Sequence, residues 1–139
     1  MRIRKGNLKD IPDCIRLCKI PEFPYLAKLS ALQAKQYLKE SVRKGIFLVA
    51  EEKQGIICLV FGEPLLHRFA WLDGLSVDKK FRGKGIGGAL FRSFCKAAKG
   101  KGCAKVYLTA PARNKKTLQL YKSLGLEQGT SLVDFLFSI

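Results

Sequence analysis

The sequence contains few of the residues that build metal centres or disulfide frameworks, and no long apolar run. Among its 139 residues there is one histidine, so a mixed Cys/His zinc site has little to draw on. The five cysteines are an odd number and no secretory leader follows Met1, so a disulfide framework is not expected. No window approaches the ~18 uncharged apolar residues of a spanning helix. These absences predict a cytoplasmic chain with no metal and no membrane partner.

Two of the cysteines are spaced as on a helix. Cys14 and Cys18 are four residues apart and could clamp a metal, but they also continue a stripe with Ile11 and Ile15 at helical spacing. Free cysteine behaves as a small apolar residue in protein cores. The pattern favours buried thiols on a helix.

Acidic residues are missing from one long segment. Between Lys79 and Leu126 there are 13 basic residues and no acid, whereas the whole chain has 26 basic and 11 acidic residues and a net charge of +15. A localised positive field attracts anions, and nucleic acid, an anionic membrane surface or a phosphorylated cofactor would each fit. The chain has no zinc-finger spacing, no RNP1-type pattern and no heptad zipper, so nucleic acid is not the expected partner.

The pattern of apolar residues predicts one domain over residues 1–139 with a mixed α/β (α+β) architecture. We expect a mixed, mostly antiparallel sheet of six to seven strands with about four helices on its two faces. The expected strands cover 3–5, 46–50, 56–61, 69–77, 103–109 and the C-terminal segment to Ile139. The expected helices cover 10–19, 31–44, 86–99 and 115–124.

One expected strand contains a carboxylate. Four apolar residues of the strand over 69–77 recur at period two and are predicted to share one face: Phe69, Trp71, Leu75 and Val77. Gly74 interrupts this strand and indicates a bulge or a close approach. Asp73 lies among the apolar residues, where an unpaired carboxylate is costly. It is therefore a candidate functional residue, or a carboxylate satisfied by a nearby arginine or by solvent.

A glycine-rich turn follows that strand, with the sequence Gly83-Lys84-Gly85-Ile86-Gly87-Gly88. It is not a dinucleotide fingerprint, because no acid follows about 20 residues later, and it is not a P-loop, because Gly88 is followed by alanine. Glycines at a helix start let backbone N–H groups converge on an oxyanion, and Arg82 and Lys84 add charge. The turn predicts a phosphate or pyrophosphate site; the alternative is a glycine-rich helix start with solvated cations.

The glycine-rich turn and the segments around it resemble the motifs of the GNAT superfamily of N-acetyltransferases. The run from Arg82 to Gly87 matches the family signature R/Q-x-x-G-x-G/A, and Leu75-Ser76-Val77 is similar to the strand end before it. Further on, the segment from Asn114 through Leu120–Leu126 is similar to the family's "N…A…L-Y-x-x-x-G-F" helix. With a similar opening at Ile3-Arg4, the resemblance covers essentially the whole chain.

The resemblance implies a sheet whose central strands splay apart around acetyl-CoA, which is the co-substrate. The coenzyme's pyrophosphate would bind Arg82, Gly83, Lys84, Gly85, Ile86, Gly87 and Gly88. Its pantetheine arm would pair with the backbone of Leu75, Ser76 and Val77. Asn114 and Lys122 are further candidate coenzyme contacts. The amine acceptor would enter from the other side, lined by the loop over 21–29 with Phe23 and Tyr25, and by Trp71.

Acetyl transfer needs a neutral attacking amine and a proton for the leaving thiolate. Tyr121 matches the family's proposed general acid; from spacing alone it could also be a core tyrosine. Asp73 is the best candidate base, with Glu63, His67 and Glu22 as fallbacks.

The expected function is acetyl-CoA-dependent N-acetyl transfer to a primary amine by direct attack in a ternary complex. A basic nucleic-acid-binding module and a non-catalytic coenzyme-A-binding regulatory domain are the alternatives. A small molecule or a protein could supply the amine, and a homodimer through the C-terminal strand is possible on this pattern.

Overall fold

The computed structural model describes residues 1–19, 28–131, 133, 135 and 137–139, and these form two compact units. The first unit covers 1–108 and holds the sheet and three helices; the second covers 109–139 and holds one helix. The elements of the first unit are β1 (Arg2–Lys5), α1 (Ile11–Cys18), α2 (Ala31–Lys44), β2 (Ile46–Glu52), β3 (Gly55–Pro64), β4 (Phe69–Val77), α3 (Ile86–Gly100) and β5 (Lys105–Tyr107). The helix of the second unit is α4 (Lys115–Ser123).

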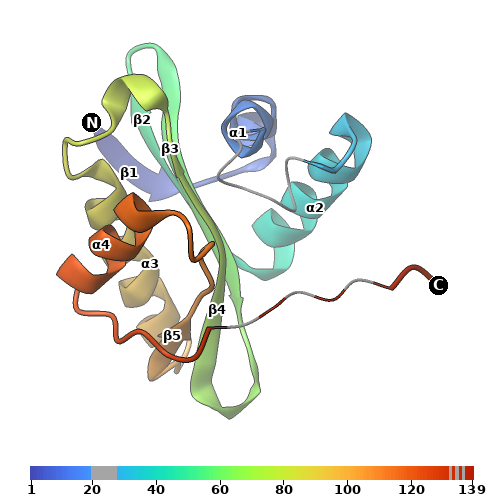
Figure 1. The fold of residues 1–139 in the computed structure, drawn as a ribbon. Helices are drawn as coiled ribbons and strands as arrows, with labels where there is room; N and C mark the ends of the chain where they lie inside the picture. The colour runs from blue at the N-terminus through green and yellow to red at the C-terminus, as the bar shows by residue number, and fades with distance from the viewer. Residues whose placement is uncertain (20–27, 132, 134, 136) are drawn as a thin grey trace. The chain divides into compact units, whose positions relative to one another are not determined.

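The sheet has five strands in the order β1-β2-β3-β4-β5, and all pairs are antiparallel except the parallel pair β4–β5. Helices α1 and α2 lie on one face of the sheet and α3 on the other (Figure 1). The predicted mixed, mostly antiparallel architecture with four helices is confirmed. No helix among the described residues is long and apolar enough to cross a membrane.

The predicted count of six to seven strands is wrong for the described residues, which form five. The C-terminal segment that alternates apolar residues is in no strand at 133, 135 and 137–139, and Phe135 is 96% exposed. A period-two pattern shows which side chains could share a face, but a strand also needs a neighbouring edge that satisfies its backbone. The sequence does not contain that information.

The face under α1 and α2 is a continuous apolar core. Ile11, Cys14, Leu17 and Cys18 of α1 are buried against strand residues such as Phe61. The predicted buried thiols are therefore confirmed, and burial raises the pKa of Cys18 to about 12. Helix α2 begins at the predicted capping box, in which Ser30 and Gln33 cap each other's backbone N–H groups.

A bulge interrupts β4 at Asp73. On one side of it Leu72 is opposite Gly62 of β3, and on the other side Gly74 is opposite Phe61, so Asp73 has no partner on β3. An extra residue of this kind bends a strand and redirects a side chain. The prediction of a bulge beside Gly74 is confirmed.

The bulge moves the second half of β4 to the other face. Trp71 is opposite Glu63 and Leu75 is opposite Val60, and residues 60 and 63 of β3 point to opposite faces. Trp71 therefore shares the α1/α2 face, to which Glu63 also belongs, while Leu75 shares the α3 face. The prediction that Phe69, Trp71, Leu75 and Val77 share one face is wrong for this reason.

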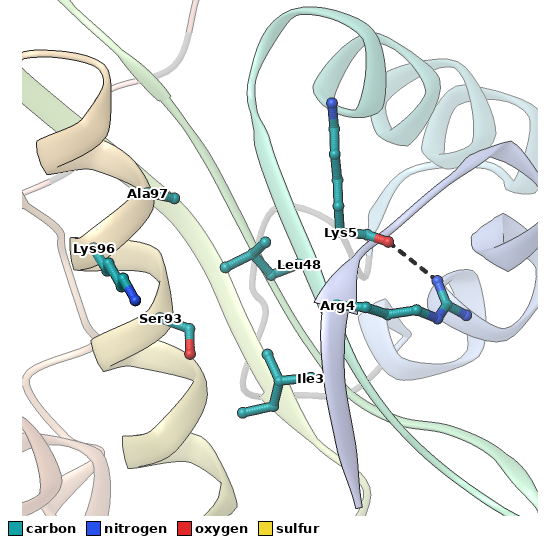
Figure 2. Close-up of a pocket in the computed structure, with 7 residues that line it drawn as sticks. All are labelled: Ile3, Arg4, Lys5, Leu48, Ser93, Lys96 and Ala97. Carbon is teal, nitrogen blue, oxygen red and sulfur yellow. Dashed lines mark hydrogen bonds between the residues drawn. The ribbon is translucent and has the colours of Figure 1, made fainter.

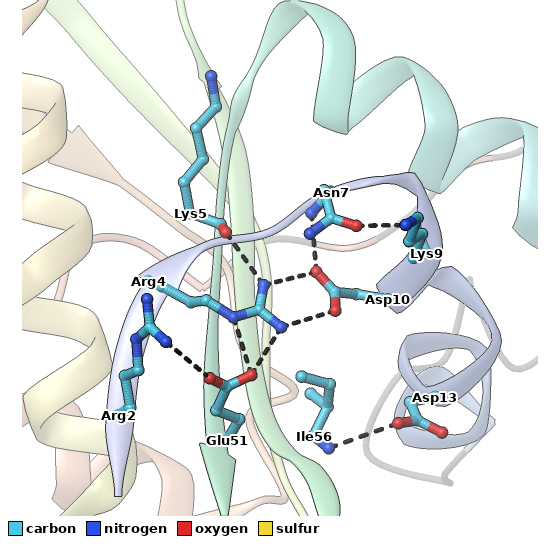
Figure 3. Close-up of polar contacts among 9 residues, drawn as sticks. All are labelled: Arg2, Arg4, Lys5, Asn7, Lys9, Asp10, Asp13, Glu51 and Ile56. Carbon is cyan, nitrogen blue, oxygen red and sulfur yellow. Dashed lines mark hydrogen bonds and ion pairs between the residues drawn. The ribbon is translucent and has the colours of Figure 1, made fainter.

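A polar network joins β1, β2 and the turn before α1 (Figure 3). The Arg4 guanidinium donates two hydrogen bonds of 2.8 Å to the two Asp10 carboxylate oxygens and one of 2.8 Å to Glu51. Asp10 is only 8% exposed, and the Arg4 hydrogen bond is the main reason that its pKa lies below the usual value. The depressed pKa means that Asp10 contributes stability above the carboxyl's usual pKa range, and loses it as pH falls.

Replacing Arg4 with methionine should lower the free energy of unfolding by about 2–4 kcal/mol at neutral pH, because it leaves the buried Asp10 carboxylate without its partner. Denaturant unfolding measures the change, and the deficit should shrink as pH falls through the depressed pKa of Asp10. The matched control is Arg2→Met, whose side chain is 75% exposed and lies 3.7 Å from Glu51. Equal losses in the two variants would contradict the buried-pair account.

Candidate acetyl-coenzyme A and amine site

The glycine turn before α3 is exposed and open. Gly83 and Gly85 both have φ of +76°, a left-handed conformation that favours glycine, and within 4 Å a Cβ at either position would meet none of the described atoms. Gly85 is the N-cap of α3, no side chain among the described residues caps that helix, and its first turn holds no acid. The first N–H groups of a helix have no acceptor within the helix, and such a helix start is the arrangement that binds anions.

The two later glycines of the motif have another role. Gly87 and Gly88 are buried in the first turn of α3, as is Ile86. Buried glycines let a helix approach the sheet closely. The motif thus combines an exposed half, Arg82 to Gly85, with a buried half that holds the helix start against the sheet.

Contacts from α1 and β4 hold the turn in place. The Asp78 carboxylate accepts a hydrogen bond of 3.0 Å from the Lys80 backbone N–H and pairs with Arg16 of α1 at 2.6 Å. The Arg82 Nε–H donates a 3.0 Å hydrogen bond to the Val77 carbonyl, so this guanidinium also fixes the end of β4. The Lys84 ammonium lies 5.3 Å from the Phe81 ring centroid.

Strands β4 and β5 pair over only three residues. Phe69, Ala70 and Trp71 lie beside Lys105–Tyr107, and beyond them β4 continues to Val77 with β3 on one side only. The described pairing of these two strands ends at Trp71 and Tyr107, and the splay that the resemblance implies stays a prediction. The unpaired edge carries the backbone of residues 72–77 towards the glycine turn.

The side chains along the unpaired edge of β4 point to both faces of the sheet. The Ser76 hydroxyl is buried and donates a 2.8 Å hydrogen bond to the Leu17 carbonyl of α1. Leu75 and Val77 are half-buried on the α3 side. These residues can therefore offer a pantetheine arm their backbone groups, with Ser76 also fixing the strand to α1.

Asp73 lies at the bulge within a group of aromatic and acidic side chains on the α1/α2 face. Burial raises the pKa of its carboxyl, and the negative charge of Glu63 raises it further. The Tyr37 hydroxyl of α2 and the Trp71 indole N–H donate hydrogen bonds to the carboxylate, which act in the opposite direction. Among the described residues, the donors to this carboxylate are therefore a tyrosine and a tryptophan, not the arginine of the alternative interpretation.

Three aromatic side chains pack together beside Asp73: Phe69, Trp71 and Tyr107. The Trp71 and Tyr107 rings are stacked with centroids 6.5 Å apart, and the Phe69 ring meets Tyr107 edge-on at 5.6 Å. Tyr107 is exposed at the end of β5. Aromatic faces of this kind attract cations, including a protonated amine.

The predicted residues of the second unit lie on or next to α4. Asn114 caps the helix, with its Oδ1 accepting a 3.3 Å hydrogen bond from the Thr117 N–H. Tyr121 is half-buried, and burial raises the pKa of its hydroxyl to about 12. Lys122 is exposed. Phe23, Tyr25 and Glu22 belong to residues 20–27, outside the described part of the chain, as does the His67 side chain.

Two hollows in the first unit lie away from Asp73 and the glycine turn. One, of about 410 Å³, lies between β1, β2 and α3 and includes Ile3, Leu48 and Lys96 (Figure 2). The other, of about 570 Å³, lies at the C-terminal end of α3 and includes Arg68 and Cys95. Neither is lined by a predicted site residue.

Tyr37 is the functional candidate that sequence reasoning missed. It neighbours Leu38 in a helix whose buried stripe is formed by Ala34 and Leu38, so the pattern gives it no special role. Its contact with Asp73 spans 36 positions of sequence and depends on how α2 packs on the bulge. A single sequence contains no signal for such a pair.

Comparisons with known proteins agree with this arrangement. The sequence model of the "Acetyltransferase (GNAT) family" matches residues 14–126. The chain is 28% identical over 145 residues to the thialysine N-epsilon-acetyltransferase of Mus musculus, covering 93% of this chain and 85% of the relative.

Solved structures share the fold. A putative acetyltransferase from Agrobacterium tumefaciens superposes with a TM-score of 0.81 at 20% identity, covering 99% of this chain and 100% of that one. An aminoglycoside N-acetyltransferase in complex with CoA gives a TM-score of 0.80 at 15% identity with the same coverage. The family match over most of the sequence, together with the similar N-acetyltransferase relative, shows that this chain belongs to the GNAT acetyltransferase family and is an N-acetyltransferase.

Proposed function

We propose that the protein transfers the acetyl group of acetyl-CoA to a primary amine by direct attack in a ternary complex. The observation that carries this proposal is the exposed, uncapped start of α3, where two left-handed glycines leave room for an anion. A diphosphate suits this position because it bears negative charge and accepts several hydrogen bonds. The full chain acts as one domain in this proposal.

The coenzyme would lie along the open edge of β4. Its diphosphate binds the exposed half of the glycine motif, with Arg82 and Lys84 adding positive charge. Its pantetheine arm pairs with the backbone of Leu75–Val77, where β5 no longer covers the strand. Asn114 and Lys122 complete the coenzyme contacts.

The acceptor amine approaches from the α1/α2 face, where Asp73 and Trp71 lie, with Phe23 and Tyr25 as further contacts. Asp73 removes one proton from the bound ammonium. The nitrogen lone pair then attacks the thioester carbonyl, the C–N bond forms, and the C–S bond breaks. Tyr121 donates its hydroxyl proton to the leaving thiolate, and the second proton that the nitrogen loses returns the Tyr121 phenolate to its protonated form, giving an N-acetylated amine and CoA.

The raised pKa of Asp73 suits a base that works near neutrality, because it brings the proton affinity of a carboxylate closer to the working pH. The raised pKa of Tyr121, about 12, keeps the hydroxyl protonated at neutral pH and so available as an acid. Two groups whose environments favour opposite roles are typical of acid–base pairs.

Tyr121→Phe should lower kcat by about 100-fold, the usual contribution of a general acid, while leaving acetyl-CoA affinity within a few-fold of the wild type. Steady-state kinetics and calorimetric titration with acetyl-CoA separate the two quantities. Equal losses of turnover and affinity would refute the acid role and indicate a packing role.

The experiment that tests the function is a screen of amine acceptors in which CoA release is followed by thiol detection. Because the mouse relative is a thialysine N-epsilon-acetyltransferase, thialysine and lysine are the first acceptors to test. Thermal stability is measured in parallel with acetyl-CoA and with duplex DNA. Stabilisation by DNA alone would favour the nucleic-acid-binding alternative, and acetyl-CoA binding with no amine accepted would favour the regulatory one.

A further inference from the structure

Tyr37 reaches the bulge of β4 from a helix that contributes no predicted catalytic residue. Its ring meets the fully buried Phe61 edge-on, with centroids 6.0 Å apart and an interplanar angle of 76°. The side chain is 39% exposed, so one side of it faces solvent. The Phe61 contact holds the ring beside the bulge, because Phe61 is opposite Gly74 of β4, and the Tyr37 hydroxyl hydrogen-bonds the Asp73 carboxylate there.

The groups around Asp73 shift the pKa of its carboxyl in opposite directions. From α2 the Tyr37 hydroxyl donates a hydrogen bond, and from β4 itself the Trp71 indole donates another. From β3, Glu63 brings a second negative charge, and it lies directly opposite Trp71. Among the described residues, Cys18 of α1 is a further titratable neighbour that acts on Tyr37, whose own pKa is raised mainly by burial.

Asp73 needs such a partner because the bulge leaves it without a strand neighbour. A carboxylate at an unpaired position can adopt several rotamers, and only some of them aim an oxygen at the acceptor amine. A donor held by ring packing in another element selects among these rotamers at little entropic cost.

We propose that Tyr37 is a positioning residue for acetyl transfer, which holds the Asp73 carboxylate at the bulge in the orientation that accepts the proton of the acceptor amine, with Glu63 of β3 as a second carboxylate on the same face. This inference rests on the proposed function, because it takes Asp73 as the base. It goes beyond that function by assigning roles to two residues that do not touch the reacting atoms.

The first test compares the pH dependence of kcat/KM in the wild type, Tyr37→Phe and Glu63→Gln. Tyr37→Phe removes a donor to the carboxylate, so the pKa of Asp73 rises and the acid limb moves to higher pH. Glu63→Gln removes a like charge, so the same limb moves to lower pH. On the acid limb, Tyr37→Phe should lower kcat/KM about tenfold, the effect of one hydrogen bond to a charged group.

The controls separate positioning from packing and from net charge. Tyr37→Phe keeps the ring on Phe61, so its thermal stability should stay close to that of the wild type. Glu40→Gln removes one charge from the same helix as Tyr37, at an exposed position paired with Lys44, and should leave the acid limb unchanged. A fall in stability with an unmoved acid limb in Tyr37→Phe would overturn the proposal.

A second readout does not depend on catalysis. Carbon-13 NMR follows the titration of the Asp73 carboxyl in the ligand-free protein, and the two variants should move it in opposite directions. An unmoved titration in Tyr37→Phe overturns the proposal whatever the kinetics show. If the titrations move as expected while both acid limbs stay in place, the positioning role and the base assignment both fail, but coenzyme binding at the glycine turn is unaffected.

Discussion

Replacing Asp73 with asparagine should lower kcat by between about 100-fold and 10,000-fold, the range that a positioned general base contributes. Asparagine has nearly the same shape and still accepts hydrogen bonds from Tyr37 and Trp71, but it cannot take the proton of the acceptor amine. The loss should therefore appear in kcat, with acetyl-CoA affinity unchanged.

The pH dependence of kcat/KM tests the same prediction in a second way. In the wild type, the acid limb of kcat/KM should lie above the pH expected from an ordinary aspartate, because burial and Glu63 raise the pKa of Asp73. In Asp73→Asn that limb should disappear. The matched control is Asp13→Asn, an exposed aspartate on α1 whose carboxylate accepts a 3.4 Å hydrogen bond from the Ile56 N–H. A full-rate Asp73→Asn enzyme would show that another group or a water removes the proton.

Gly85→Val should weaken acetyl-CoA binding by about 100-fold. Valine disfavours the left-handed conformation at φ of +76°, so the turn must rearrange, and its amides no longer converge. Loss of two hydrogen bonds to a charged group, at roughly 1.5 kcal/mol each, gives an effect of this size. Calorimetric titration with acetyl-CoA measures it directly.

The control for Gly85→Val is Gly102→Val at the other end of α3, about 22 Å away along the helix axis. Gly102 has φ of +85°, and it likewise has open space around its Cβ position among the described atoms. Both substitutions therefore introduce the same backbone strain, and both should lower stability. Only Gly85→Val should weaken coenzyme binding; equal binding losses would attribute the effect to general destabilisation.

The glycine turn could be predicted from sequence because its conformation depends on nearby residues. Positive φ at Gly83 and Gly85 and a helix start at Ile86 all follow from local glycine content and periodicity. The bulge beside Gly74 was predictable for the same reason. These features require no knowledge of what packs against them.

The predictions that are wrong concern features that depend on contacts between residues distant in the sequence. Strict alternation predicts one face for the apolar residues of β4, whereas the extra residue Asp73 places Leu75 and Val77 on the other face. The C-terminal strand was assigned from alternation alone, without a partner edge. Tyr37 was missed because its role comes from the packing of α2 on Phe61.

Anion binding by the glycine turn is the basis of the proposed function, and one measurement tests it directly in the wild-type protein. Calorimetric titration compares acetyl-CoA with S-acetylpantetheine, which keeps the acetyl thioester and the pantetheine arm but lacks the diphosphate and the nucleotide. We expect acetyl-CoA to bind at least about 100-fold more tightly, since the turn contributes several charge-assisted hydrogen bonds. Equal affinity for the two compounds would contradict the account, because it would show that the open turn at α3 holds no phosphate.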